Sequence, residues 1–174
     1  MAAYSKNNTI NNKSIFQGAF FMYNISTIIN FFLAKSDLSP KKLQKLLYYA
    51  YCWVLALLNE SYEQINIRLF NERIEAWVHG PVIPSVYQRY KSYGGMNIPG
   101  VKCFDNNLLS SEVLDILNQV WDVYGNFSGN QLEVISHKEY PYINARKGLP
   151  PYEPCDNLIS DRDIFYYFNE QSSK

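Results

Sequence analysis

The sequence predicts a mainly α-helical fold: a single compact helical domain around a central helix, with a small β-hairpin. Apolar residues recur at helical spacing through most of the chain, and one short region alternates apolar and polar residues as strands do. The chain has 174 residues, of which 47% are apolar. That length suits one full hydrophobic core, whereas two separate cores would be cramped.

The central helix is predicted at residues 40–59. Ser39 is a suitable N-cap, and Pro40 fits the first helical position. A broad apolar stripe follows at Leu43, Leu46, Leu47, Ala50, Trp53, Val54, Leu57 and Leu58. Five residues are expected to lie largely off this stripe: Lys41, Lys42, Lys45, Tyr49 and Cys52.

The hairpin is predicted at residues 65–78. Apolar and polar residues alternate over 65–69 and again over 74–78, and Asn71 is placed at the turn between the two strands. Gly80-Pro81 is expected to end the second strand, and Pro84 to open a helix.

The other periodic segments predict a helix from Met22 and further helices at 84–94, 110–125, 128–135, 141–147 and 160–168. Ser128 and Gln131 fit a capping box at the start of one of them. The Asn- and Ser-rich start of the chain suggests a flexible tail. The expected organisation is therefore an N-terminal tail at 1–21, a domain at 22–170 and a C-terminal tail at 171–174.

Composition argues against several classes of protein, including polyanion-binding, disulfide-bonded and membrane-spanning proteins. Lys plus Arg and Asp plus Glu are equal, at 16 each, which argues against a surface built to hold a polyanion. The cysteines Cys52, Cys103 and Cys155 are odd in number and far apart, as expected of free thiols in a reducing cytoplasm. No apolar run reaches membrane-spanning length, and the first residues lack the apolar core of a signal peptide. These features predict a cytoplasmic protein.

Catalysis finds little support in the sequence. Cys52 could pair with His79 or His137, but it lies among apolar residues of the central helix, where an inert thiol is usual. Two histidines without ligand spacing do not predict a metal site. Nucleotide-binding and hydrolase motifs are absent. The expectation is a protein that is not an enzyme and has no cofactor.

Nucleic-acid binding is a weaker alternative. Basic residues occur near tyrosines on the central helix and on the helix after Pro84: Lys41, Lys42, Lys45, Arg89 and Lys91. Such residues can contact phosphates and stack on bases. The balanced charge instead favours a solvated helix face, so nucleic acid is not the expected partner.

Residues 75–94, EAWVHGPVIPSVYQRYKSYG, concentrate aromatic and turn residues. If Ala76 and Val78 face the core, Trp77 and His79 face outward or into a groove. Exposed Trp and Tyr are favoured at protein interfaces, although Trp77 could equally cover the hairpin against a helix. Gly80 and Pro81 are expected to form a rigid turn.

Four stretches resemble the Panacea domain, the SocA-like antitoxin family of phage-associated proteins. They are KLQKLLYYAYCWVLAL (42–57), LFNERIEAWVHGPVIPSVYQRY (69–90), QLEVISHKEYPYINARKG (131–148) and LISDRDIFYYF (158–168). The resemblance spans about residues 22–168. Tyr142 stands where the family usually has Trp, and residues 59–68 are longer than the usual turn.

The resemblance implies an antitoxin of a type II toxin–antitoxin pair, which binds a toxin encoded beside it. It also leaves open a proteolytic adaptor that delivers the toxin to a Clp-type protease, or a nucleic-acid-binding regulator. It implies no cofactor, metal or catalytic residue, and the sequence does not indicate the oligomeric state.

The expected partner surface comprises Trp77, His79, Tyr87, Tyr90, Tyr49 and Lys45. The expected structural turn comprises Gly80, Pro81 and Pro84. The alternative is that this block is scaffold, and that the choice of toxin depends on the loops at 95–107 and 149–158.

Overall fold

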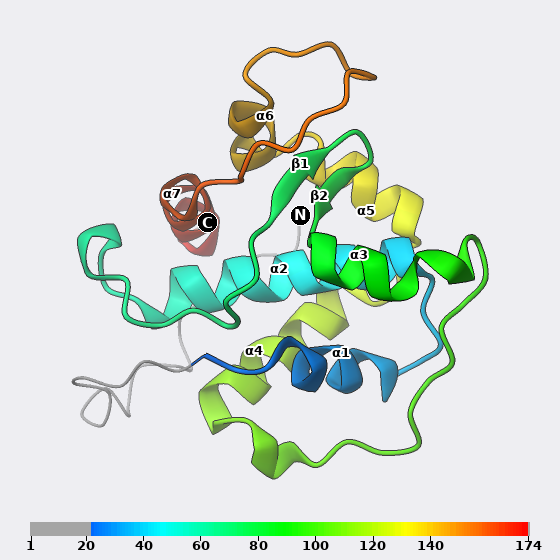
Figure 1. Cartoon of the computed structure of the whole chain (residues 1–174). Helices are drawn as coiled ribbons and strands as arrows, with labels where there is room; N and C mark the ends of the chain where they lie inside the picture. The colour runs from blue at the N-terminus through cyan, green and yellow to red at the C-terminus, as the bar shows by residue number, and fades with distance from the viewer. Residues whose placement is uncertain (1–21, 174) are drawn as a thin grey trace.

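Helix α2 (Pro40–Leu58) crosses the middle of the molecule, and the other elements surround it (Figure 1). The structure is a computed structural model and describes residues 22–173. Ser39 caps α2 by accepting a hydrogen bond from the Lys42 amide, as predicted, and Pro40 is in the first turn. Every residue from 43 to 56 is buried. Helix α2 therefore has no solvent-exposed face along most of its length.

The complete burial of α2 corrects one expectation. Lys45, Tyr49 and Cys52 lie within the core, not on an exposed face, because α2 is covered from several directions. It packs directly against five helices and one strand: α1, α3, α4, α5, α7 and β2. A stripe of apolar residues indicates which face is buried, but it does not show that the opposite face is also covered.

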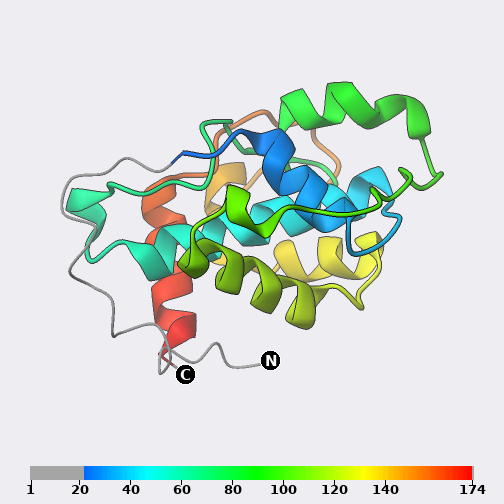
Figure 2. The same ribbon diagram turned by 90° about the horizontal axis from the view of Figure 1, so that it is seen from below.

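Within residues 22–173, six further α-helices complete the mainly helical fold, which confirms the predicted fold class. They are α1 (Ile25–Leu33), α3 (Pro84–Tyr90), α4 (Ser111–Tyr124), α5 (Gly129–Ser136), α6 (Tyr140–Arg146) and α7 (Asp161–Ser172). Three short 3-10 helices occur at Tyr62–Gln64, Lys91–Tyr93 and Asn106–Leu108. Seen from below, α4 lies along α2, on the side away from the hairpin (Figure 2).

Side-chain caps fix the starts of α4, α5 and α7. Ser110 accepts from the Val113 amide at the start of α4. The predicted capping box of α5 is confirmed, with reciprocal bonds between Ser128 and Gln131. Ser160 caps α7.

The β-hairpin is present, but its predicted position was wrong. Strand β1 (Glu75–Trp77) pairs antiparallel with β2 (Gly80–Val82), so the turn lies at residues 78–79 and not at Asn71. Gly80 adopts a φ of +92°, which a glycine tolerates and which returns the chain into the second strand. Gly80-Pro81 therefore begins a strand where the sequence analysis expected one to end. Pro84 opens α3 as predicted.

Residues 65–69 form no strand of the hairpin. The amide oxygen of buried Asn59 accepts hydrogen bonds from the backbone of Asn66 and Ile67, both at 2.9 Å. These bonds satisfy backbone donors that strand pairing would otherwise use. The partner of β1 on its other side is instead the segment 157–159, where Ala76 N donates to Asn157 O at 2.9 Å.

The expected tails have different outcomes. The N-terminal tail, residues 1–21, lies outside the described residues. Helix α7 continues to Ser172, so the first two residues of the expected tail at 171–174 are helical. Ser172 is buried and donates to the Asn169 carbonyl, which shows that the last turn packs against the domain.

Candidate protein-binding site

Trp77 lies at the end of β1 and is held by its neighbours. Its indole Nε1 donates to Glu75 Oε2 at 2.7 Å. Its ring makes an edge-type contact with the ring of Tyr87, at 5.0 Å between centroids. Trp77 is half-buried, whereas Tyr87 on α3 is 40% exposed. The two aromatic rings therefore connect the hairpin to the first turn of α3 at the surface.

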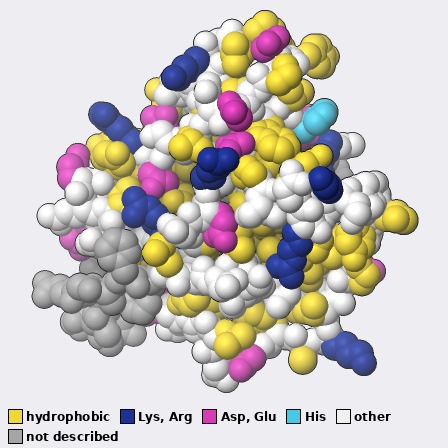
Figure 3. Space-filling view, in the orientation of Figure 1, with side chains coloured by type: hydrophobic (Ala, Val, Ile, Leu, Met, Phe, Trp, Pro, Cys, Tyr) yellow, Lys and Arg dark blue, Asp and Glu magenta, His cyan; other side chains and the backbone are white. Residues whose placement is uncertain are grey.

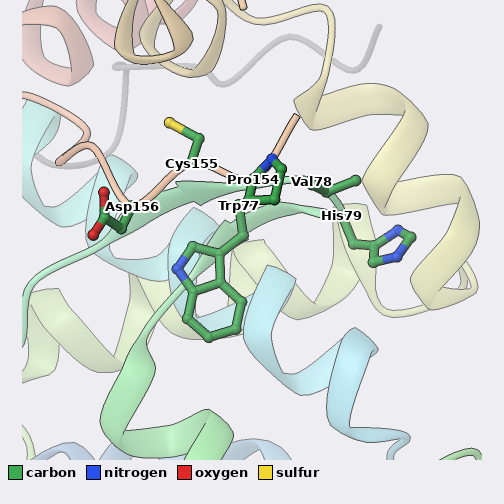
Figure 4. A pocket seen from close by; sticks show the side chains of 6 residues that line it. All are labelled: Trp77, Val78, His79, Pro154, Cys155 and Asp156. Atoms are coloured by element: carbon green, nitrogen blue, oxygen red, sulfur yellow. The ribbon is translucent and has the colours of Figure 1, made fainter. Parts of the chain in front are cut away.

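A pocket of about 440 Å³ lies beside Trp77. The hairpin tip contributes Trp77, Val78 and His79, and the loop after α6 contributes Pro154, Cys155 and Asp156 (Figure 4). From the sequence, the partner surface is expected either at residues 75–94 or at the loops 95–107 and 149–158. The structure brings residues 75–94 and 149–158 together at one pocket, whereas the loop at 95–107 packs elsewhere, against the end of α1 and the residues after it.

His79 is the exposed residue of the hairpin tip, with 71% of its side chain accessible. Its Nδ1 lies 3.0 Å from Glu133 Oε1, and the other oxygen of Glu133 accepts from Lys41 Nζ at 2.6 Å. Partial burial of Glu133 opposes its ionisation, but the bonds from Lys41 and His79 outweigh burial and lower its pKa. The tip is thus connected to α5 and to the start of α2.

Three side chains support the hairpin from beneath by donating to its backbone carbonyls. Lys45 Nζ donates to His79 O at 2.6 Å and to Pro81 O at 2.9 Å. The Tyr142 hydroxyl donates to Trp77 O at 2.8 Å, and Arg146 Nη1 to Ala76 O at 3.1 Å. Tyr142 thereby uses its hydroxyl to hold the hairpin. The hairpin carbonyls therefore accept hydrogen bonds from side chains, where a larger sheet would supply backbone donors from a third strand.

Three of the predicted partner residues are buried. Lys45 is 1% exposed, and burial lowers its pKa to about 7. Tyr49 is fully buried, stacks on Tyr124 with ring centroids 4.0 Å apart, and donates to Glu139. Tyr90 is also buried. Of the predicted set, therefore, Trp77, His79 and Tyr87 are the side chains with substantial exposure on the described surface.

Glu139 is a buried acid that the sequence analysis did not single out. Its carboxylate accepts from the hydroxyls of Tyr49 at 3.1 Å and Tyr48 at 3.4 Å. Burial raises its pKa to about 8, although the two hydroxyls favour the ionised form. Glu139 precedes α6 and thereby ties that helix, which supports the hairpin through Tyr142 and Arg146, to α2.

The geometry does not activate Cys52 as a nucleophile. Its thiol is fully buried, and burial raises its pKa, whereas a reactive cysteine needs a lowered one. Within residues 22–173, no three His, Cys, Asp or Glu side chains form a group that could hold a metal ion. In that same part of the chain, no helix has the length and apolar character needed to cross a membrane.

Large apolar side chains are exposed around the pocket and on the adjoining elements. Loop 149–158 exposes Leu149, Leu158 and Tyr152, the last to 88%, and α6 exposes Tyr140 and Ile143. Figure 3 shows hydrophobic side chains gathered over the hairpin and over the loop at the top of this face. Exposed apolar side chains gathered in this way are typical of protein-binding sites.

Comparison with known proteins identifies a family. No curated protein and no solved structure matches the chain. The family model described as "Antitoxin SocA-like, Panacea domain" matches residues 43–142, more than half of the sequence. The match runs from the first turn of α2 into α6 and includes the whole hairpin and its supports Lys45 and Tyr142. The chain therefore belongs to the SocA-like antitoxin family with a Panacea domain.

Proposed function

We propose that this protein is the antitoxin of a type II toxin–antitoxin pair and neutralises a toxin encoded beside it by direct contact. It acts as a binding protein and not as an enzyme. Family membership supports an antitoxin role. Neutralisation by direct contact is supported by the exposed apolar side chains around the Trp77 pocket. The hairpin tip and loop 149–158 form this pocket.

The proposed interface centres on the Trp77 pocket. Trp77 and Tyr87 are rigidly packed aromatic residues at the surface, and such residues contribute most to binding energy at interfaces. Stable protein–protein interfaces bury roughly 1,200–2,000 Å² in total. The exposed side chains of α6, Tyr140 and Ile143, extend the apolar surface beyond the pocket and supply part of that area.

A co-expression experiment tests this function. The adjacent gene is expressed alone and together with this protein, growth is scored, and the neighbour's product is purified through a tag. Growth arrest alone, rescue together and a stoichiometric complex are the expected results. Rescue without a complex, while the level of the neighbour's product falls only when a Clp-type protease is present, would instead establish the adaptor. Absence of toxicity would contradict both.

A further inference from the structure

We propose that the Trp77 pocket receives an arginine side chain of the bound toxin, with the guanidinium over the indole ring and paired with the Asp156 carboxylate. This inference rests on the proposed function, since it assigns the chemistry of the partner at the same site. It predicts one arginine of the toxin as a central contact of the complex.

The floor of the pocket offers an aromatic ring and no free indole donor. Trp77 Nε1 already donates to Glu75 Oε2, and contact with Tyr87 holds the ring in place. Val78 and Pro154 add apolar surface beside it. Trp is the aromatic side chain that binds cations best, and a ring held in advance loses little entropy when a ligand stacks on it.

The rim of the pocket carries unpaired negative charge. Asp156 lines the pocket, and Glu153 lies three residues before it on the same loop. Both residues are exposed, and neither carboxylate has a hydrogen bond or ion pair among residues 22–173. Figure 4 places Asp156 on one side of Trp77 and His79 on the other.

Three basic side chains in and around the hairpin and α6 already have acceptors. Arg146 donates to the backbone carbonyls of Ala76, Pro150 and Glu153. Arg73 pairs with Glu75 at 2.9 Å, and His79 pairs with Glu133. The Asp156 carboxylate is therefore available to a cation from outside the chain.

Arginine fits this combination better than other side chains. Its planar guanidinium is weakly hydrated, stacks on aromatic rings and pairs with a carboxylate through two hydrogen bonds. A lysine ammonium pairs as a point charge and stacks less well. An apolar or aromatic side chain would fill the pocket, but it would displace water from the Asp156 carboxylate and offer no hydrogen bonds in exchange, which costs free energy.

A titration with short peptides tests the pocket without the toxin. The full chain, isotopically labelled, is titrated with acetyl-Gly-Arg-Gly-amide, and the NMR signals of the Trp77 indole and of residues 154–156 are followed. Saturable shifts at these positions are expected in the millimolar range, up to about 20 mM for a ligand this small. The Leu and Glu analogues are expected to bind at least several-fold more weakly, and the Lys analogue to lie between. No shift with the Arg peptide, or equal affinity for Leu, would overturn the proposal.

A matched pair of variants tests the carboxylate. Asp156→Asn should lower the affinity for the Arg peptide and for the toxin several-fold. The affinity for the Leu peptide should not change. Asp122→Asn is the control, because Asp122 is an exposed acid on α4 with no hydrogen bond or ion pair among the described residues. Equal binding of the toxin by both variants would contradict the arginine contact.

The two proposals fail in different ways. If a complex with the neighbour's product forms but survives Asp156→Asn and every single Arg→Ala change in the toxin, the antitoxin role stands and the arginine contact is wrong. If the Arg peptide binds at Trp77 but the neighbour's product neither arrests growth nor binds, the pocket chemistry stands and the proposed function is wrong.

Discussion

Lys45 Nζ donates a 2.6 Å hydrogen bond to the backbone carbonyl of His79, which ties the tip of the hairpin to the second turn of α2. The same amine donates to Pro81 O, so one buried side chain holds both ends of the turn region. Lys45 thus positions the half-buried Trp77 and the exposed His79 from below. The proposed partner surface is therefore supported by a side chain of the central helix.

Replacement of Lys45 by Met is expected to destabilise the fold. The carbonyls of His79 and Pro81 would lose their donor inside the protein, which is expected to lower the free energy of unfolding by about 1–3 kcal/mol. Urea unfolding followed by circular dichroism measures the change. Lys91→Met, at an exposed position after α3, is the control and should change the stability by less than about 0.5 kcal/mol. Equal values for the two variants would show that the Lys45 bonds do not hold the hairpin.

Gly80→Ala should destabilise the domain for two reasons. Gly80 has a φ of +92°, and an added Cβ would lie 2.7 Å from Lys45 Nζ and 3.0 Å from Ser136 Oγ. The expected loss is about 1–3 kcal/mol. Gly95→Ala is the matched control, because its Cβ would meet nothing within 4 Å, and it should be neutral or slightly stabilising. Thermal melts of both variants that coincide with wild type would contradict this account of the turn.

Glu139 makes stability depend on pH. Its pKa rises from 4.5 to about 8 on folding, so between these values the folded protein holds a proton that the unfolded chain has released. The stabilisation is complete below pH 4.5 and is lost as the pH rises toward 8. Between pH 5 and pH 7 the free energy of unfolding of wild type should fall by on the order of 2 kcal/mol relative to Glu139→Gln.

The Glu139 comparison isolates one group. Lys45 has a lowered pKa of about 7, so its effect is of opposite sign and increases stability as the pH rises above that value. Restricting the urea titrations to pH 5–7 keeps the contribution of Lys45 small. Subtracting the free energies of unfolding of Glu139→Gln removes the rest of that contribution, because Lys45 is present in both proteins. A difference between wild type and variant that does not change with pH would show that Glu139 titrates normally.

Trp77→Ala is expected to weaken binding of the toxin far more than Lys41→Ala. Loss of a rigid aromatic anchor at the centre of an interface raises the dissociation constant by about 30-fold or more, equivalent to about 2 kcal/mol. Lys41 is a partly exposed partner in a surface ion pair with Glu133, where removal costs little. Titration calorimetry measures both, and Trp77→Phe controls for folding. Equal weakening by folded Trp77→Ala and Lys41→Ala would remove Trp77 from the binding site.

The thiols should react in an order set by burial. Cys103 is exposed, Cys155 is partly exposed and Cys52 is buried with a raised pKa. An aromatic disulfide reagent is expected to label Cys103 first, Cys155 more slowly and Cys52 only in denaturant. Cys52→Ala should leave toxin neutralisation intact. Rapid labelling of native Cys52, detected by mass spectrometry of digested protein, would reopen a catalytic role.

Local signals predicted the helices well, because their caps and apolar spacing are encoded within a few residues. Ser39, Ser128 and Ser160 all cap the helices that the sequence assigned to them. The hairpin was misplaced, since a Gly-Pro pair ends a strand in most contexts and here begins one. Long-range contacts determine that register: the bonds from Lys45, Tyr142 and Arg146 to the hairpin carbonyls, and the close approach of Lys45 to Gly80.

The candidate site was predictable only in part for the same reason. Trp77, His79 and Tyr87 were found from their place in one aromatic-rich stretch. Pro154 and Asp156 are more than sixty residues further along the chain, in a loop with no motif. They reach the pocket because Arg146 and the pairing of β1 with 157–159 hold that loop. The burial of Lys45, Tyr49 and Tyr90 depends on helices that pack around α2 from distant parts of the sequence.

Direct neutralisation is the central claim, and purified components test it most directly. The toxin from the adjacent gene and this protein are mixed without any protease, and the mixture is analysed by size-exclusion chromatography and for toxin activity. We predict a stable complex of defined stoichiometry in which the toxin is inactive, and which Trp77→Ala disrupts. A fully active toxin that elutes apart from this protein, although co-expression rescues growth, would contradict neutralisation by contact.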